Sequence, residues 1–308
     1  MIDEKMMDRF AGALLGLAVG DALGTTLEFA PRTTTGEPPH TEMVGGGPFN
    51  MKPGEWTDDT SMACCLAESI VTRKGFDERD QLERYVRWMD EGHWSVKGRC
   101  FDIGGTTSRA RNRLKRTGHV WAGKGTENDN ANGSLMRLAP LPMAWFRQSS
   151  EFVADLAAKS SRTTHGGAEA EAACRLWAVL IADAIKGQDD PGRYIGKVPA
   201  EAYTLRSRVY RATQGHTVGT DTPATGYALD GVELALTALC STTTFEAGLV
   251  AVVNQGGDAD TNGAIYGQLA GAVYGASRIP ARWITKLAWR NKLEDLTVDL
   301  WKFAKGGK

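Results

Sequence analysis

Apolar residues along this chain recur at the three- and four-residue spacing of helices that pack on one face. One stripe comprises Leu82, Tyr85, Val86 and Met89, and a longer one comprises Ala173, Leu176, Trp177, Leu180, Ile181 and Ala184. No convincing series of alternating apolar and polar residues indicates strands. We therefore expect an all-α fold, a compact orthogonal helical bundle in a single domain over residues 1–308 with its core at about residues 8–303.

Small residues recur with a spacing of four in two regions. The first contains Gly12, Gly16 and Gly20, and the second contains Gly263, Gly267, Gly271 and Gly275. This spacing places each set along one face of a helix, where glycine costs about 1 kcal/mol relative to alanine. The pattern predicts that both helices make close contacts around a buried centre.

The segment from residue 31 to residue 55 interrupts the helical pattern. It contains five prolines and the triplet Gly45-Gly46-Gly47, which forbid a continuous helix. Loops longer than roughly 12 to 15 residues in compact domains are usually functional or disordered. Because this loop leads directly to Thr57, it could be a lid beside a substrate; the alternative is that its middle is a disordered surface excursion.

The composition is that of an ordinary globular protein. Apolar residues make up 42% and charged residues 24%, and the formal net charge of −1 gives no overall attraction to nucleic acid or to an anionic membrane. Five cysteines without a CxxC pair are expected to be reduced and mostly buried. The first residues lack the basic region followed by an apolar core that is typical of a signal peptide, and the apolar run after Phe10 is interrupted at Asp21, short of the roughly 20 residues that span a bilayer. We expect a cytoplasmic protein with no membrane partner.

Two segments concentrate oxygen-bearing side chains where helices are expected to begin. They are Trp56-Thr57-Asp58-Asp59-Thr60-Ser61 and Gly256-Gly257-Asp258-Ala259-Asp260-Thr261-Asn262. Taken singly, each is typical of a helix N-terminus, where Thr or Asp caps backbone amides and acids complement the dipole. Taken together, four Asp and two Thr could hold two ions that prefer oxygen ligands, such as Mg²⁺ or Mn²⁺.

Four motifs extend this pattern over nearly the whole chain. They are the run from Gly12 to Gly24 followed by Glu28, then Thr57-Asp58-Asp59-Thr60, then Asn132-Gly133-Ser134-Leu135-Met136-Arg137, and then the run from Gly257 to Ala264. In these motifs and their order the sequence resembles the ADP-ribosylglycohydrolase family. Within it, Phe101-Asp102-Ile103-Gly104 and Thr164-His165 are most similar to the branch of dinitrogenase reductase activating glycohydrolase, which removes ADP-ribose from arginine.

The resemblance implies a metal-dependent hydrolase with a binuclear centre. The ligands of its two divalent cations, Mg²⁺ or Mn²⁺, would be Thr57, Asp58, Asp59, Asp258, Asp260 and Thr261. The substrate would be an ADP-ribosyl group joined to a protein side chain through C1 of its distal ribose. The ions would lie beside the ribose hydroxyls and a water molecule.

Glu28 and Asp102 are the candidate catalytic residues. Cleavage at C1 passes through an oxocarbenium-like state, and a carboxylate can stabilise that state, activate water or protonate the leaving group. Glu28 matches a family glutamate at the edge of the metal centre, and its alternative is a solvated loop carboxylate. Asp102 could instead cap the helix that residues 103–107 introduce. The sequence does not divide the roles between them.

The candidate substrate-binding residues are Asn132, Gly133, Ser134 and His165. The first three offer a flexible backbone and two hydrogen-bonding side chains, suited to a diphosphate or a ribose. Their alternative is a glycine turn with Ser134 as a helix N-cap. By the resemblance, His165 hydrogen-bonds the diphosphate or a ribose, whereas a lone histidine is more often structural. The remaining histidines lack the spacing of zinc ligands.

Residues 97–124 form a basic stretch with eight Lys or Arg residues against the single acid Asp102. A solvated helix face is the default interpretation. The stretch could also steer an acidic protein target. Nucleic acid is not favoured, because the stretch lacks interleaved aromatic residues and a recognised binding module. The sequence leaves the oligomeric state open.

These features predict an ADP-ribosyl hydrolase that acts on modified protein side chains, with arginine as the expected linkage. The same fold could instead act on serine-linked or nucleobase-linked ADP-ribose, because metal and ribose motifs do not report the leaving group. A second alternative is a non-catalytic ADP-ribose-binding or structural protein. Binding alone, however, needs fewer carboxylates than the proposed ligands together with Glu28 and Asp102 provide.

Overall fold

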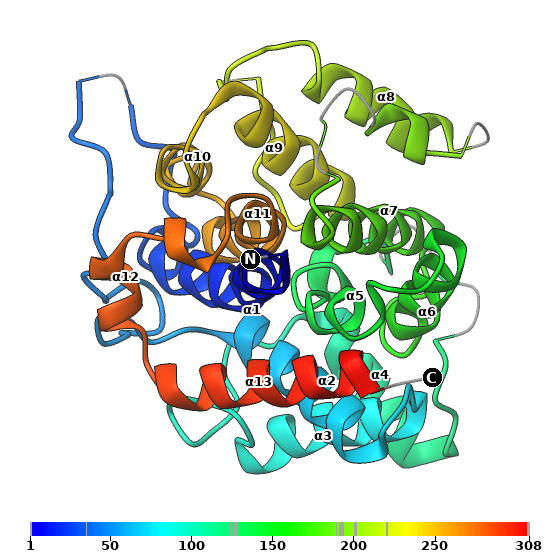
Figure 1. The fold of residues 1–308 in the computed structure, drawn as a ribbon. Coiled ribbons are helices and arrows are strands. Elements are labelled where there is room, and N and C mark those ends of the chain that lie inside the picture. Colours follow the sequence, from blue (N-terminus) through cyan, green and yellow to red (C-terminus); the bar gives the residue numbers. More distant parts are fainter. Residues whose placement is uncertain are drawn as a thin grey trace.

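The computed structural model describes residues 2–34, 36–122, 125, 129–188, 190, 194–199, 202–219 and 221–306, which form helices and loops (Figure 1). The α-helices are α1 (Ile2–Gly24), α2 (Asp58–Arg73), α3 (Glu78–Glu91), α4 (Gly105–Thr117), α5 (Pro140–Trp145), α6 (Ser150–Arg162), α7 (Ala168–Ile185), α8 (Tyr203–Ala212), α9 (Ala228–Ser241), α10 (Phe245–Val253), α11 (Ala259–Tyr274), α12 (Ala281–Lys286) and α13 (Arg290–Gly306). Four 3-10 helices are η1 (Thr25–Leu27), η3 (Asn132–Ser134), η5 (Ile195–Lys197) and η6 (Ala276–Arg278). In these ranges strand-like pairing is limited to two isolated bridges, so the all-α prediction is confirmed.

Helices α1 and α11 form the centre of the fold, and they lie side by side in Figure 1. They run antiparallel and pair Gly12 with Gly271, Gly16 with Gly267 and Gly20 with Gly263. A Cβ atom added to Gly16 would lie only 2.2 Å from the carbonyl oxygen of Gly267. Backbone therefore packs directly on backbone, as the glycine spacing predicted, and no larger residue fits along this contact.

Gly275 does not continue the row of glycines that was predicted along one face of α11. Helix α11 ends at Tyr274, and Gly275 follows it with φ +91°, while its amide donates to the carbonyl of Gly271. A side chain there would meet the carboxylate of Asp8 rather than α1 backbone. The prediction was wrong at this position, because the chain leaves the helix one residue before the fourth glycine would join the row.

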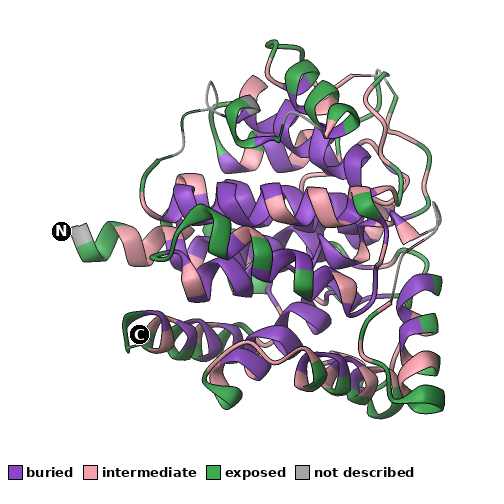
Figure 2. Ribbon diagram, turned by 90° about the vertical axis from the view of Figure 1, so that its right-hand side faces the viewer, coloured by how far each residue is buried: buried purple, intermediate pink, exposed green. Residues whose placement is uncertain are grey.

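Other helices surround this pair and supply the remaining core. Helix α1 contacts α2, α7, α11 and α13, and buried positions dominate the central helices in Figure 2. By length and composition the segment Asp3–Leu27 would suffice for a membrane span, but 83% of its most apolar window is buried inside the protein. The predicted stripe on α7 is fully buried, whereas that on α3 is buried at Leu82 and Tyr85 and only partly at Val86 and Met89. The single-domain boundary at residues 1–308 stays a prediction.

The long segment between η1 and α2 is packed against the bundle. Asn254 on the end of α10 bonds to Thr33 and to the backbone of His40, and Met43 and Met51 are buried. The described part of this segment is therefore ordered by contacts, which contradicts the expectation of a disordered middle. Residue 35 lies outside the described residues. All five cysteines are free thiols, and Cys64, Cys65 and Cys174 are buried, as predicted.

The glycine contact generates a stability prediction. Gly16→Ala should lower the free energy of unfolding by about 1–3 kcal/mol or more, because its methyl group would force the two helix backbones apart. Urea denaturation monitored by circular dichroism measures this change. Gly75→Ala is the matched control, since a Cβ atom there would meet nothing within 4 Å. Equal stability of the Gly16 and Gly75 variants would contradict the backbone contact.

Candidate metal and substrate site

A cavity of about 560 Å³ opens where the N-terminal ends of α2, α4 and α11 meet η3. Its lining includes Glu28, Phe29, Asp58, residues 102–107, residues 131–133, Met136, His165, residues 224–226, Gly257, Asp258 and Thr261. The N-terminal end of a helix carries a partial positive charge and unpaired amide groups. The cavity therefore combines carboxylate side chains with three backbone ends that attract anions.

Asp21 joins α1 to the start of α2. Its carboxylate accepts hydrogen bonds from the amides of Thr57 and Thr60, at 2.8 and 3.0 Å, and from both hydroxyls, at 2.9 and 2.6 Å. The side chain is fully buried. An acid from another helix thus satisfies the free amides at the start of α2, which positions the next carboxylates along the chain.

Two groups of carboxylates meet at the cavity, one beneath it and one partly in its lining. In one, Asp21, Asp59 and Asp260 each offer an oxygen within 4.8 Å of the others, and in the other, Glu28, Asp102 and Asp260 do the same. Asp260 belongs to both groups. The hydroxyl of Thr57 lies centrally in the first, 3.1 Å from oxygens of Asp59 and Asp260.

The donor atoms fit divalent cations with a preference for oxygen. Asp59 Oδ1, Asp260 Oδ1 and Glu28 Oε2 are buried without a hydrogen-bond partner. An unpartnered buried carboxylate oxygen is costly unless a cation neutralises it. Among the described residues none of these three carboxylates pairs with Lys, Arg or His. Hard cations such as Mg²⁺ or Mn²⁺ would meet this demand.

Burial of these acids and repulsion between them also raise their affinity for protons. Burial, and then the charge of neighbouring acids, raises the pKa of Asp58, Asp59 and Asp260 well above the ordinary value. Burial and the charges of Asp260, Asp102 and Asp258 raise the pKa of Glu28 to about 12. If no cation shares their charge, these carboxyl groups therefore keep their protons to a higher pH than ordinary carboxyl groups do.

Burial raises the pKa of Asp102 to about 7, with Asp21 and Asp258 adding repulsion. Its backbone is left-handed, with φ +57°, and Gly104 rather than Asp102 occupies the N-cap position of α4. The capping alternative is therefore wrong for Asp102. The solvated alternative is also wrong for Glu28, which is 5% exposed.

The two acidic motifs do begin helices, but their side chains do not cap them. Thr57 precedes α2 and Asp258 precedes α11, and neither side chain accepts a hydrogen bond from an amide of its own helix. Asp258 instead accepts from Asn132 Nδ2 at 2.6 Å. Asp58, Asp258 and Thr261 line the cavity, while Thr57, Asp59 and Asp260 lie buried beneath it.

Three of the four candidate substrate-binding residues line the cavity: Asn132, Gly133 and His165. A Cβ atom on Gly133 would lie 2.9 Å from the His165 ring, so the ring needs glycine beside it. Ser134 differs, because its hydroxyl lies 2.8 Å from that of Ser161 and is buried behind the cavity wall. The structure does not bring the Ser134 side chain to the cavity, and the Ser134 hydroxyl makes no N-cap hydrogen bond either.

Several residues of the site carried no clear sequence signal. Asp21 could have been noticed as a lone acid in a long apolar helix, because such a group needs a partner when buried. Phe29 lines the cavity at 69% exposure, and its left-handed backbone donates to Gly257. Residues 224–226 lie far from every motif in sequence and reach the cavity only through the tertiary fold.

The long segment at residues 31–55 supports the site from outside. None of its described residues lines the cavity, so the lid prediction is wrong for this arrangement. The Phe49 ring instead packs on Phe101 at 5.4 Å, and Lys97 donates to the carbonyls of Phe49 and Asn50. These contacts hold the residues that lead into Asp102.

The basic stretch is largely engaged within the protein. Arg111 and Lys115 both pair with Asp90, Arg109 pairs with Asp129, and Arg113 donates to the carbonyl of Thr163. Arg99 and Arg116 are exposed. These contacts agree with a partly solvated helix face. Lys124 lies outside the described residues.

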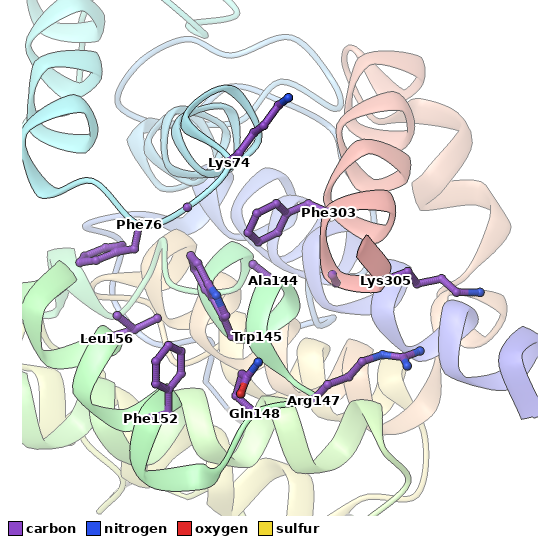
Figure 3. A pocket seen from close by; sticks show the side chains of 12 residues that line it. Lys74, Phe76, Ala144, Trp145, Arg147, Gln148, Phe152, Leu156, Phe303 and Lys305 are labelled. Carbon is purple, nitrogen blue, oxygen red and sulfur yellow. The ribbon is translucent and has the colours of Figure 1, made fainter. Parts of the chain in front are cut away.

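A second cavity, of about 480 Å³, lies between α5, α6 and the end of α13 (Figure 3). Aromatic residues such as Trp145, Phe152 and Phe303 face it, and the charged ends of Lys74 and Lys305 point away from its centre. Its lining contains no carboxylate, so it offers no ligands for a cation.

Comparisons with known proteins agree on one family. The family model for ADP-ribosylglycohydrolase matches residues 3–307. ADP-ribosylarginine hydrolase Tri1 of Pseudomonas putida is 40% identical and covers 96% of this chain and 79% of its own. ADP-ribosyl-[dinitrogen reductase] glycohydrolase of Rhodospirillum rubrum is 34% identical, over 93% of this chain and 92% of its own. A solved structure titled ADP-ribosylglycohydrolase-related protein complex is 41% identical, with a TM-score of 0.84 over 98% of this chain and 99% of the other.

The raised proton affinities predict how stability depends on pH. A folded carboxyl group with a raised pKa contributes stability that is lost as the pH rises from the ordinary value towards the raised one. For Asp102 that range runs from 3.8 to about 7. Metal-free protein should therefore melt at a lower temperature at about pH 7.5 than at about pH 5, and Mg²⁺ should raise the melting temperature more at the higher pH.

Thermal melts with and without a chelator measure this dependence. Asp102→Asn should reduce the pH dependence of the metal-free protein, because the amide does not titrate whereas the other acids with raised pKa values remain. A metal-free melting temperature that rises over this pH range, or an equal effect of Mg²⁺ at both values, would contradict the prediction.

Proposed function

This chain belongs to the ADP-ribosylglycohydrolase family, a family of hydrolases that cleave glycosidic bonds to ADP-ribose, and we propose that its own substrate is protein carrying ADP-ribose on arginine. The names of the Tri1 relatives from Pseudomonas putida and Serratia proteamaculans support arginine as the linkage. The observation that carries the proposal is the pair of carboxylate groups that share Asp260 at one cavity.

The residues divide into two positions for divalent cations. Asp21, Asp59, Asp260 and the hydroxyl of Thr57 would hold one ion. Glu28 and Asp260 would hold a second, with Asp102 beside them for proton transfer and with Asp58, Asp258 and Thr261 on the cavity wall. Two Mg²⁺ or Mn²⁺ ions there would supply positive charge that orients ribose hydroxyls and a water molecule. Asp21 extends the ligand set expected from the sequence.

Asp102 is suited to proton transfer. It faces the cavity and has its pKa raised to about 7, so it can exchange a proton near neutral pH. Glu28 lies beside it with its pKa raised further, so the two carboxyl groups favour different protonation states. In the proposed reaction Asp102 or Glu28 assists the departure of the side chain or the attack of water.

Other residues of the cavity suit the anionic part of ADP-ribose. The backbone at Gly104 and Gly105 begins α4 inside the cavity, and a Cβ atom on Gly104 would meet nothing within 4 Å. Packing therefore does not require glycine at position 104, whereas close approach of a diphosphate to the backbone would. Asn132 and His165 add side-chain hydrogen-bonding groups on the same cavity.

The residues of the site also bear on the two alternatives to an arginine-directed hydrolase. Serine-linked or nucleobase-linked ADP-ribose would use the same metal and ribose contacts, so only the leaving group distinguishes these substrates. A protein that merely binds ADP-ribose would have no need for so many mutually repelling buried carboxylates. The cytoplasmic location, the absence of a membrane or nucleic-acid partner, and the binuclear count stay predictions, and the oligomeric state stays open.

The function is tested with defined substrates. Arginine-linked ADP-ribose should be hydrolysed faster than serine-linked or nucleobase-linked ADP-ribose, and removal of divalent cations should lower the initial rate by about 100-fold or more. Release of ADP-ribose is measured with and without a chelator, followed by Mg²⁺ or Mn²⁺ addition. Full activity in metal-free protein would reject the metal-dependent mechanism, and a preference for another linkage would reject arginine.

Asp102→Asn separates chemistry from binding. The amide keeps the shape of the side chain but cannot exchange a proton, so kcat should fall by about 10²- to 10⁴-fold while ADP-ribose affinity changes little. Asp90→Asn is the matched control, because Asp90 pairs with Arg111 and Lys115 and does not line the cavity. Metal content is measured for both variants. An unchanged kcat with intact metal content would exclude Asp102 from proton transfer.

A further inference from the structure

A continuous chain of hydrogen bonds leads from a buried arginine to the ring of His165. Arg137 Nη2 donates to Thr164 Oγ1 at 2.6 Å, and Thr164 Oγ1 lies 2.8 Å from His165 Nδ1. All three side chains are at least 98% buried. His165 lines the cavity, and the hydrogen bonds of the described residues include none to its Nε2 atom.

The direction of each bond follows from the chemistry of the groups. A guanidinium can only donate, so the Thr164 oxygen accepts from Arg137. The Thr164 hydroxyl then has one hydrogen to place, and His165 Nδ1 is its only hydrogen-bond acceptor among the described residues. Nδ1 must accept that hydrogen, which leaves the proton of the neutral imidazole on Nε2.

The other tautomer would leave an unmet hydrogen bond. If Nδ1 carried the proton, both Arg137 and His165 would donate to Thr164, and the buried Thr164 hydroxyl would have no acceptor. A buried polar group without a partner costs about 1–3 kcal/mol, enough to favour the first arrangement by roughly tenfold or more. The protonated ring is disfavoured too, because burial and the Arg137 charge lower the His165 pKa to about 3.

Arg137 itself is held by contacts that keep its charge in place. Its guanidinium lies 4.3 Å from the centre of the Tyr85 ring, and Nη1 contacts Met62 Sδ at 3.8 Å. No carboxylate forms an ion pair with it among the described residues. The arginine is therefore a fixed donor whose orientation does not depend on a mobile acid.

We propose that Arg137 and Thr164 are positioning residues that fix His165 as the neutral Nε2–H tautomer, so that the ring presents a hydrogen-bond donor to an anionic oxygen of the ligand in the cavity. Gly133 admits this edge of the ring, since a Cβ atom there would lie 3.1 Å from Nε2. The effect on ligand binding rests on the proposed function, because the anionic oxygen is taken to belong to ADP-ribose. The tautomer itself does not.

The tautomer is tested first in the ligand-free protein. With ¹⁵N-labelled histidine, long-range proton–nitrogen correlation spectra should show Nε2 protonated and Nδ1 bare in His165, assigned by comparison with His165→Gln. In Thr164→Val the Nδ1 resonance should move to the position of a nitrogen that accepts no hydrogen bond. A protonated Nδ1 in the unmodified protein would overturn the proposal, whatever the activity of the enzyme.

Ligand affinity is tested second, by calorimetric titration with ADP-ribose. Thr164→Val should weaken binding about tenfold through loss of the fixed donor, and Thr164→Ser should restore it, because serine keeps the hydroxyl. Thr163→Val is the matched control: that hydroxyl donates to the carbonyl of Ser160 and accepts from Gln81, without contacting His165.

The outcomes separate the two proposals. Circular dichroism checks that each variant is folded, and if Thr164→Val does not fold, the tautomer measured in the unmodified protein still decides the proposal. If the unmodified protein fails to bind ADP-ribose, the proposed function fails while the tautomer result stands. If it binds and Thr164→Val binds equally well, or Thr163→Val loses as much affinity, the positioning role is overturned.

Discussion

The direct contact between the backbones of α1 and α11 is the constraint on which the site depends. Near the end of this contact a Cβ atom on Gly24 would lie 2.5 Å from the Cα of Asp260, so no side chain separates the helices where the acids are. Asp21 on one helix and Asp260 on the other consequently meet within one carboxylate group. This close contact has two costs. Each glycine lowers the intrinsic stability of its helix, and the negatively charged carboxylates repel one another where they meet.

Hydrogen-bond donors at the start of α2 and at Asn132 stabilise part of this negative charge. The start of α2 gives two amides and two hydroxyls to Asp21, and Asn132 gives an amide hydrogen to Asp258. Asp59 Oδ1, Asp260 Oδ1 and Glu28 Oε2 receive no such bond. The protein thus stabilises some of its buried carboxylates by itself and leaves the others to be neutralised by protons or cations, which couples its stability to both.

Residues around the cavity shift proton affinity in opposite directions. At the acids, burial raises proton affinities and creates a demand for cations. At His165, burial and then the charge of Arg137 lower the pKa of the ring and keep the imidazole neutral. A ligand with a sugar at one end and phosphates at the other suits this division, because hydroxyls can join a cation site while phosphate oxygens accept from amides and an imidazole N–H.

The sequence by itself determined the elements and much of the chemistry of this protein. Hydrophobic periodicity indicated a helical fold, the spacing of glycines predicted the central contact, and the acidic motifs marked two helix starts that bring carboxylates together, because each of these properties is local. The tertiary structure decided the rest. Asp21 became the partner of α2, Ser134 turned inwards, Gly275 left the row of glycines, and residues 224–226 reached the cavity. Those outcomes depend on which distant backbone meets a given residue, and no pattern of neighbours in the chain specifies that meeting.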